Sequence, residues 1–188
     1  MELEGLLSSN GCVMFAPKEW TTYIISSKRK ILVGPSLLLQ HGIKKGELLN
    51  LSAQQLLDCA DTSFLHGDSE EGGNMFAAFS YMLKNGGLAR WEIYPYKMRK
   101  GRCNGQLARQ QAAQIDSFHI ENYVIENRLR ALIDKQPVVA QVLANRSFAD
   151  YDGRFFAGYP TETTNHEVLI IGYGTDPEHR DFWMIKNS

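Results

Sequence analysis

The first part of the chain repeats apolar residues at the spacing of amphipathic helices. In residues 17–28, Trp20, Tyr23 and Ile24 fall on one helical face, and Pro17 suits the first turn of such a helix. Residues 51–59 form a second helix, whose start has the capping-box pattern. Here the Ser52 hydroxyl accepts from the backbone three residues on, and the Gln55 side chain reaches back to the amide of Ser52.

Residues 73–87 predict a longer amphipathic helix. Two glycines end it, Gly86 and Gly87. Its apolar side, which we expect in the core, carries Met75, Phe76, Phe79 and Met82.

The pattern changes in the second part of the chain. A short helix over 127–136 is expected to stop at the residue before Pro137. β-Branched and aromatic runs then follow at 137–144, 167–174 and 182–188, separated by turn residues, and these predict strands. Helices followed by strands, without alternation, indicate an α+β protein with two unlike lobes around a cleft.

Composition and charge narrow the classes of function. With 188 residues, 44% of them hydrophobic, the chain can bury a substantial core as one large domain or two small lobes. A formal net charge of -1 makes nucleic acid and anionic membranes poor partners. No segment is long and apolar enough to span a membrane, and the first ten residues lack the features of a secretory signal, so we expect a soluble chain without a targeting segment. No metal-spaced cluster and no phosphate-binding loop is apparent, so we expect neither metal nor cofactor.

Three polar residues suggest nucleophilic catalysis. His166 stands directly before a buried strand, and Asn187 closes the next one, so a hairpin would bring the two together. An amide that accepts from one imidazole nitrogen leaves the other free to activate a nucleophile. Cys12 is the candidate nucleophile, helped by an imidazolium or a helix N-terminus. The alternative is that His166 is a hydrogen-bonded residue at the edge of the core.

Seven stretches now carry a family resemblance. In order from about Lys45 to Ser188, the chain resembles the papain-like cysteine peptidases, the class of cathepsins and plant vacuolar proteases, in the stretches LLNLSAQQLLDC, EEGGNMFAAFSYMLKNGG, EIYPYK followed by Cys103, LIDKQPVVAQV, YDGRFFAG, TNHEVLIIGYG and FWMIKNS. The resemblance implies the papain-like two-lobe fold, with a helical lobe over 1–115 and an antiparallel, barrel-like β lobe over 116–188 in one peptidase domain.

The resemblance also assigns roles. His166 matches the catalytic base, Asn187 its orienting amide, and Cys12 the nucleophile. Cys59 and Cys103 match a family disulfide; the alternative is two buried free thiols.

Substrate-binding positions follow from the same resemblance. Gly72 and Gly73 match the glycines that pair with substrate backbone, although a plain turn also explains them. Specificity-pocket positions match Met75, Gln141 and Glu167. As hypotheses, Glu167 favours a basic substrate side chain or holds the charged form of His166; if it points to solvent, it does neither.

Departures from the family concern both ends of the chain. Leu6 stands where the family has the glutamine that donates to the oxyanion, and Val13-Met14 replaces Trp-Ala. Pro17 is unfavourable inside a helix that begins at Cys12; if the helix begins at Pro17 instead, Cys12 lies outside it. The chain stops at Ser188, before the strands that complete the family's β lobe, so we expect a truncated lobe whose sheet keeps an open edge.

Two functions are therefore predicted as alternatives. The first is a cysteine-type endopeptidase that acts through a thioester acyl-enzyme. The second is a catalytically inactive papain-fold fragment, or a peptide-binding relic. The resemblance further implies a monomer, peptide or protein substrates, cystatin-like inhibitors as partners, and a vacuolar, lysosomal or extracellular location.

Overall fold

The computed structural model describes most of the chain from residue 49 onward. The described residues are 12–15, 49–60, 75–120, 124–144, 146–149, 155–156, 166–178 and 180–186. The chain divides into two compact units, residues 25–120 and residues 1–24 together with 121–188. The predicted helix over 17–28 lies outside the described residues.

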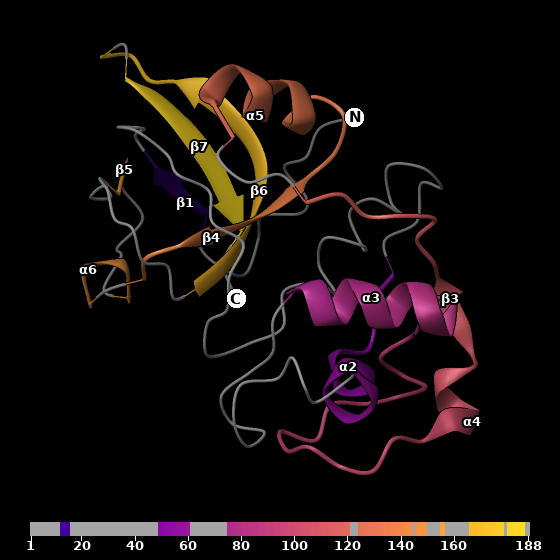
Figure 1. Cartoon of the computed structure of the whole chain (residues 1–188). Helices are drawn as coiled ribbons and strands as arrows, with labels where there is room; N and C mark the ends of the chain where they lie inside the picture. Colours follow the sequence, from indigo (N-terminus) through magenta and orange to yellow (C-terminus); the bar gives the residue numbers. More distant parts are fainter. Residues whose placement is uncertain are drawn as a thin grey trace. The chain divides into compact units, whose positions relative to one another are not determined.

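The unit of residues 25–120 contains three helices and a small sheet among its described residues. Two of these helices, α2 (Ala53–Cys59) and α3 (Met75–Asn85), pack on each other (Figure 1). The third, α4 (Gly105–Ala108), lies beside the antiparallel pair β2 (Leu88–Ala89) and β3 (Gln111–Ala113).

The start of α2 confirms half of the predicted capping box. The Ser52 hydroxyl accepts from the Gln55 amide at 2.9 Å. The other half is wrong, because the Ser52 amide donates to the Ala89 carbonyl at 3.0 Å. Gln55 is fully buried, and its side chain reaches into the core instead, where its oxygen accepts from the Ala89 amide at 2.8 Å. The glutamine thus ties α2 to β2 rather than capping its own helix.

Helix α3 ends where the two glycines were expected to end it. Gly86 and Gly87 have φ values of +78° and +132°, which only glycine adopts without strain. Met75 and Met82 are buried as predicted. Phe76 is 38% exposed, however, and so the prediction that it lies in the core is wrong. The positions between the two methionines that face the core are alanines.

The phenylalanines of α3 form an aromatic cluster of their own. Phe79 is half-buried, so it too lies outside the fully buried core. The ring of Phe118 stacks on Phe79 at 5.5 Å and meets Phe76 edge to face at 5.7 Å. This contact shields the outer side of the helix with the segment that follows β3.

The second unit is built on a five-stranded sheet with the order β4-β6-β7-β1-β5. Its strands are β4 (Val138–Val142), β6 (His166–Thr175), β7 (Asp181–Lys186), β1 (Cys12–Phe15) and β5 (Phe155–Phe156). The pairs β4–β6, β6–β7 and β7–β1 are antiparallel, whereas the pair β1–β5 is parallel. The three strands predicted in the second part of the chain are confirmed as β4, β6 and β7.

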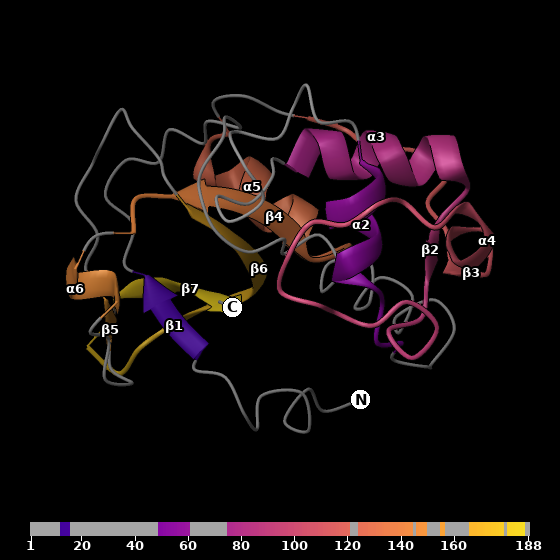
Figure 2. The same cartoon turned by 90° about the horizontal axis from the view of Figure 1, so that it is seen from below.

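Strand β1 pairs along one side of β7, a pairing that the sequence did not predict. Residues 12–15 pair along β7 in antiparallel register, from Cys12 opposite Lys186 to Phe15 opposite Trp183 (Figure 2). The N-terminal stretch therefore covers the edge of β7 that would otherwise expose unpaired backbone groups.

The core of this unit lies between the sheet and α5 (Glu126–Ile133), which packs against β6. The helix α6 (Arg146–Ala149) adds Phe148 to the same core. The core side chains are Val124, Leu129, Ala140, Val142, Phe148, Val168, Ile170, Trp183 and Ile185. Helix α5 ends at Ile133, three residues before the predicted end at Gln136, and the amides of Lys135 and Gln136 both donate to the Leu132 carbonyl in the turn that follows.

The helices of the described segments are short. None of them combines the length and apolar character that crossing a membrane requires.

Candidate active site

His166 is the first residue of β6 and lies at the border of the core. It is half-buried and pairs in register with Val142 of β4. Its ring meets the ring of Phe148 edge to face, with 5.8 Å between the centroids. A strand start places a polar side chain at the end of a buried run, so the position suits both a core-edge histidine and a catalytic base.

Gln141 and Glu167 form a buried polar pair beside this histidine. They face each other in the register of β4 and β6 and are only 3% and 4% exposed. The alternative that Glu167 points to solvent is therefore wrong. Because successive residues of a strand point to opposite faces, Glu167 and His166 lie on opposite faces of the sheet. Glu167 is thus poorly placed to pair directly with the imidazole.

Strand β7 runs toward the predicted orienting amide. Lys186, its last residue, pairs with Leu169, three positions beyond His166 on β6. Asn187 follows Lys186 in the sequence but lies outside the described residues, as do Gly72 and Gly73.

Cys12 does not begin a helix, because it is the first residue of strand β1. The Cα of Cys12 lies opposite that of Lys186 on β7, which in turn lies opposite that of Leu169 on β6. Cys12 is therefore two strands away from His166 across the sheet and three residues away along the strand direction. Strand spacing of about 4.8 Å and a rise of about 3.3 Å per residue put the two Cα atoms about 14 Å apart. That exceeds the span of a direct cysteine–histidine hydrogen bond, so this register does not bring the predicted pair together.

Met75, the remaining predicted pocket residue, belongs to the other unit. It is the first residue of α3 and only 4% exposed. Its burial accords with its place in the apolar side of the helix.

The disulfide implied by the family resemblance is confirmed. Cys59, the last residue of α2, bonds to Cys103, 44 positions further along the sequence, with Cα atoms 4.7 Å apart. The alternative of two free thiols is wrong. Cys12 is therefore the one cysteine of the chain's three that is not part of this disulfide.

An ionic contact that the sequence did not reveal joins α5 to β7. The Arg130 guanidinium lies 2.7 Å from Glu126 and 2.9 Å from Asp181. Its carbon also lies over the rings of Tyr173 and Trp183, at 4.9 and 5.9 Å from their centroids. This arrangement holds the first residue of β7 against α5, at the end of the strand opposite to Asn187. The contact depends on how α5 packs against β6 and on the register of β6 and β7, so no pattern within one segment predicts it.

The charges of this contact shift the acid–base behaviour of Asp181. A hydrogen bond from Thr175 and the nearby Arg130 lower the pKa of the Asp181 carboxyl below its usual 3.8. Hydrogen bonding to Glu126 raises the pKa of Arg130 further above its ordinary value. Asp181 therefore remains charged in mildly acidic solution.

A metal site finds no support in the part of the chain that the structure describes. No three histidine, cysteine, aspartate or glutamate side chains gather there in a way that would hold an ion.

Comparison with known proteins identifies the class. The sequence profile described as "Papain family cysteine protease" matches residues 36–188, which include His166 and Asn187 but not Cys12. The chain is 36% identical over 149 residues to the "Low-temperature-induced cysteine proteinase" of Solanum lycopersicum, covering 79% of this chain and 42% of that protein. It is 37% identical over 147 residues to "Zingipain-2" of Zingiber officinale, covering 78% and 64%.

Solved structures agree with these sequence matches. Bromelain from Ananas comosus in complex with the E64 inhibitor superposes with a TM-score of 0.69 at 33% identity, covering 83% of this chain and 70% of that one. The ragweed pollen allergen Amb a 11, a cysteine protease in its proform, gives a TM-score of 0.72 at 30% identity, covering 83% and 42%.

The helices, the antiparallel sheet and these neighbours define a papain-like fold of the cysteine protease class. Since the matched residues make up well over half of its sequence, the chain belongs to the papain family of cysteine proteases. It spans between 42% and 64% of the length of the two relatives named above.

Proposed function

We propose that this chain is a cysteine-type endopeptidase that hydrolyses peptide bonds through Cys12, His166 and Asn187. The observation that carries the proposal is the family match over residues 36–188, within which His166 opens a strand of the central sheet and Asn187 directly follows the neighbouring strand. We take the two units as the helical and β lobes of one peptidase domain.

In the proposed reaction, the Cys12 sulfur attacks the carbonyl carbon of the scissile bond while His166 accepts the thiol proton. His166 returns this proton to the leaving amine, and a thioester acyl-enzyme forms. Water activated by the same imidazole then hydrolyses the thioester and releases the second product. Asn187 accepts from the other imidazole nitrogen and holds the ring in place. Without an oxyanion donor at Leu6, we expect a rate about 10²- to 10³-fold below that of a complete site.

This reaction requires Cys12 to leave its place opposite Lys186 in β1, since the register separates it from His166 by about 14 Å. Strand β1 has only four residues, and one of its neighbours, β5, has two. Few backbone hydrogen bonds therefore hold β1 and β5 to the rest of the sheet, so β1 can detach from β7 while the sheet stays folded.

For substrate binding we propose that Gly72 and Gly73 pair with the substrate backbone. Met75, Gln141 and Glu167 are proposed to contact the substrate side chain that sets specificity, and the buried Glu167 carboxyl favours a basic one. Replacing Glu167 with glutamine should lower the preference for lysine or arginine over leucine at that position, measured as a ratio of kcat/KM values. An unchanged ratio would rule out this role.

A second candidate function is peptide binding without hydrolysis. It is favoured by the place of Cys12 in β1 and by its position outside residues 36–188. In this case His166 is a core-edge residue packed on Phe148.

The two candidates differ in turnover of a fluorogenic peptide at mildly acidic pH. The endopeptidase predicts hydrolysis that both Cys12→Ala and His166→Ala abolish. His119→Ala, which changes an exposed histidine of the other unit, serves as the control and should leave the rate unchanged. Peptide binding without turnover in the unmodified chain would refute the first candidate and support the second.

Partners and location follow the class. We propose that E64, the inhibitor bound in the bromelain structure, and cystatin-like proteins inhibit this chain. We also propose that it acts as a monomer in a vacuole, a lysosome or the extracellular space, where the Cys59–Cys103 disulfide would persist.

A further inference from the structure

The unit of residues 25–120, which we call the helical unit, carries a concentrated positive charge that the whole chain does not. Its described residues include seven lysines and arginines against three aspartates and glutamates, whereas the chain as a whole has a net charge of -1. No acidic residue occurs in residues 93–115. Five cations fall in this segment: Lys97, Arg99, Lys100, Arg102 and Arg109. All are exposed except the half-buried Lys100, and none forms an ion pair within the described part of the chain.

We call residues 96–102 the basic loop, and its backbone is held from the inside. Gln54 accepts from the Lys97 amide at 2.8 Å and donates to the Arg99 carbonyl at 2.7 Å. Asp58 accepts from the Gly101 amide at 2.6 Å. The Cys59–Cys103 disulfide closes the far end of the loop.

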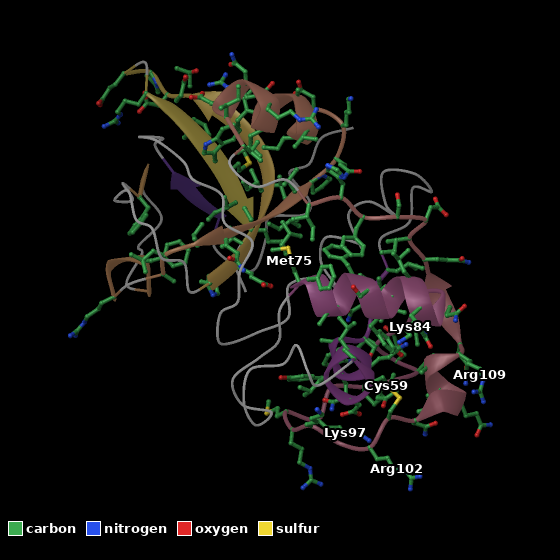
Figure 3. The ribbon with its side chains drawn as sticks, viewed as in Figure 1. Cys59, Met75, Lys84, Lys97, Arg102 and Arg109 are labelled. Atoms are coloured by element: carbon green, nitrogen blue, oxygen red, sulfur yellow. A yellow bond between two sulfur atoms is a disulfide. The ribbon has the colours of Figure 1, made fainter. Side chains whose placement is uncertain are left out.

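This anchoring determines where the loop's side chains go. Since Gln54 and Asp58 occupy its inner side, the cations project outward, as Figure 3 shows for Lys97 and Arg102 beyond α2. A loop fixed in advance loses little conformational entropy when a partner binds.

An apolar side chain stands among these charges. Met98 is 83% exposed and has a φ of 59°, in the left-handed region that non-glycine residues seldom adopt. The neighbouring Tyr96 is 42% exposed, and its ring lies 6.1 Å from that of Trp91. A large apolar side chain held outward at the expense of backbone strain indicates a contact with something outside the chain.

We propose that the basic loop is the docking surface for an acidic segment of a partner protein, with Met98 as its apolar anchor. Methionine, tyrosine, tryptophan and arginine are the residues enriched at protein–protein interfaces. Apolar anchors contribute most of the binding energy, and the surrounding charges select an acidic partner and speed its association. This docking is independent of the proposed peptidase activity, because none of its residues belongs to the candidate active site.

The test measures fluorescence anisotropy of labelled polyglutamate peptides bound to the full chain. One peptide has leucines at regular intervals, and its match has serines at the same positions. We expect the leucine peptide to bind more tightly than the serine peptide, and to be released at about 0.5 M salt, where screening is strong.

Variants separate the two parts of the surface. Lys97→Ala should weaken binding of the leucine peptide about threefold, whereas Lys84→Ala, which removes an equal charge from α3, should not change it. Met98→Ala should weaken it about fivefold and remove the advantage of leucine over serine. Met98→Gly should weaken binding equally without lowering the denaturation midpoint, because glycine accepts the left-handed backbone.

Heparin provides the contrasting ligand, a sulfated polysaccharide with no apolar side chains. Tighter binding of heparin than of the leucine peptide, unaffected by Met98→Ala, would overturn the assignment of a protein partner. Absence of binding to either peptide, or equal losses from Lys84→Ala and Lys97→Ala, would also overturn it.

Discussion

Asp58 offers the sharpest test of how the helical unit holds its shape. The residue is 8% exposed, and its carboxylate accepts three hydrogen bonds. Gln54 and Gly101 donate to Oδ1 at 2.7 and 2.6 Å, and the Tyr94 hydroxyl donates to Oδ2 at 2.8 Å. The residue therefore links α2 to the basic loop and to the Tyr94 side chain.

The geometry predicts different costs for two substitutions of Asp58. Asp58→Ala removes the acceptor from three donors, and at about 1.5 kcal/mol for each bond to a charged group the loss is about 4.5 kcal/mol. Asp58→Asn keeps one oxygen, which still serves Gln54 and Gly101. Its NH₂ group then faces the Tyr94 hydroxyl, which can accept instead of donating. The expected cost of this variant is about 1.5 kcal/mol.

Urea unfolding at neutral pH, followed by tryptophan fluorescence, measures both values. With a slope of about 2 kcal/mol per molar urea, Asp58→Ala should lower the midpoint by about 2 M. Asp116→Ala removes an exposed carboxylate of the same unit and should stay within about 0.5 kcal/mol of the unmodified chain. If Asp58→Ala cost less than 1 kcal/mol, or no more than Asp58→Asn, the described network would not stabilise the unit.

Three further predictions concern the disulfide, the end of α3 and pH. Replacing Cys59 and Cys103 by serine should lower the free energy of unfolding by about 4 kcal/mol in the loop-entropy estimate, measured in urea; a loss below about 1 kcal/mol would contradict it. Gly87→Ala should cost about 3 kcal/mol, because a Cβ would overlap the Ala113 carbonyl of β3, whereas Gly86→Ala meets only a flexible side chain and should cost about 1 kcal/mol. Thermal unfolding checks this order, and equal costs would refute it. The pKa of Asp181 is lowered in the folded chain, so its stabilisation is present above its ordinary pKa of 3.8 and is lost as pH falls below that value. Asp181→Asn should therefore flatten the acid limb of the stability curve, and an unchanged limb would count against the contact.

Local patterns were sufficient to predict the longer elements. A capping box predicted α2, helical spacing predicted α3, and β-branched runs predicted β4, β6 and β7, because each element carries its signal within its own residues. Strand β1 escaped prediction for the opposite reason. Its four residues carry little periodicity, and the strand that stabilises it, β7, lies more than 160 residues further along the chain.

The candidate site was predicted in the same uneven way. The place of His166 at a strand start and the Cys59–Cys103 pairing followed from sequence and resemblance. The burial of Glu167 opposite Gln141 did not, because it depends on the register of two strands and not on either strand alone. The same holds for Gln55. Its capping-box position was visible in the sequence, but the buried Ala89 amide that takes its side-chain oxygen instead was not.

The most direct test of the proposed chemistry is where a thiol-reactive epoxide binds covalently. The purified chain is treated with the epoxide at mildly acidic pH, digested, and mapped by mass spectrometry. The endopeptidase proposal predicts a single adduct on Cys12 that His166→Ala abolishes and His119→Ala leaves intact. No adduct on Cys12, or the same yield with and without His166, would contradict it, because the sulfur would then not be activated by that imidazole.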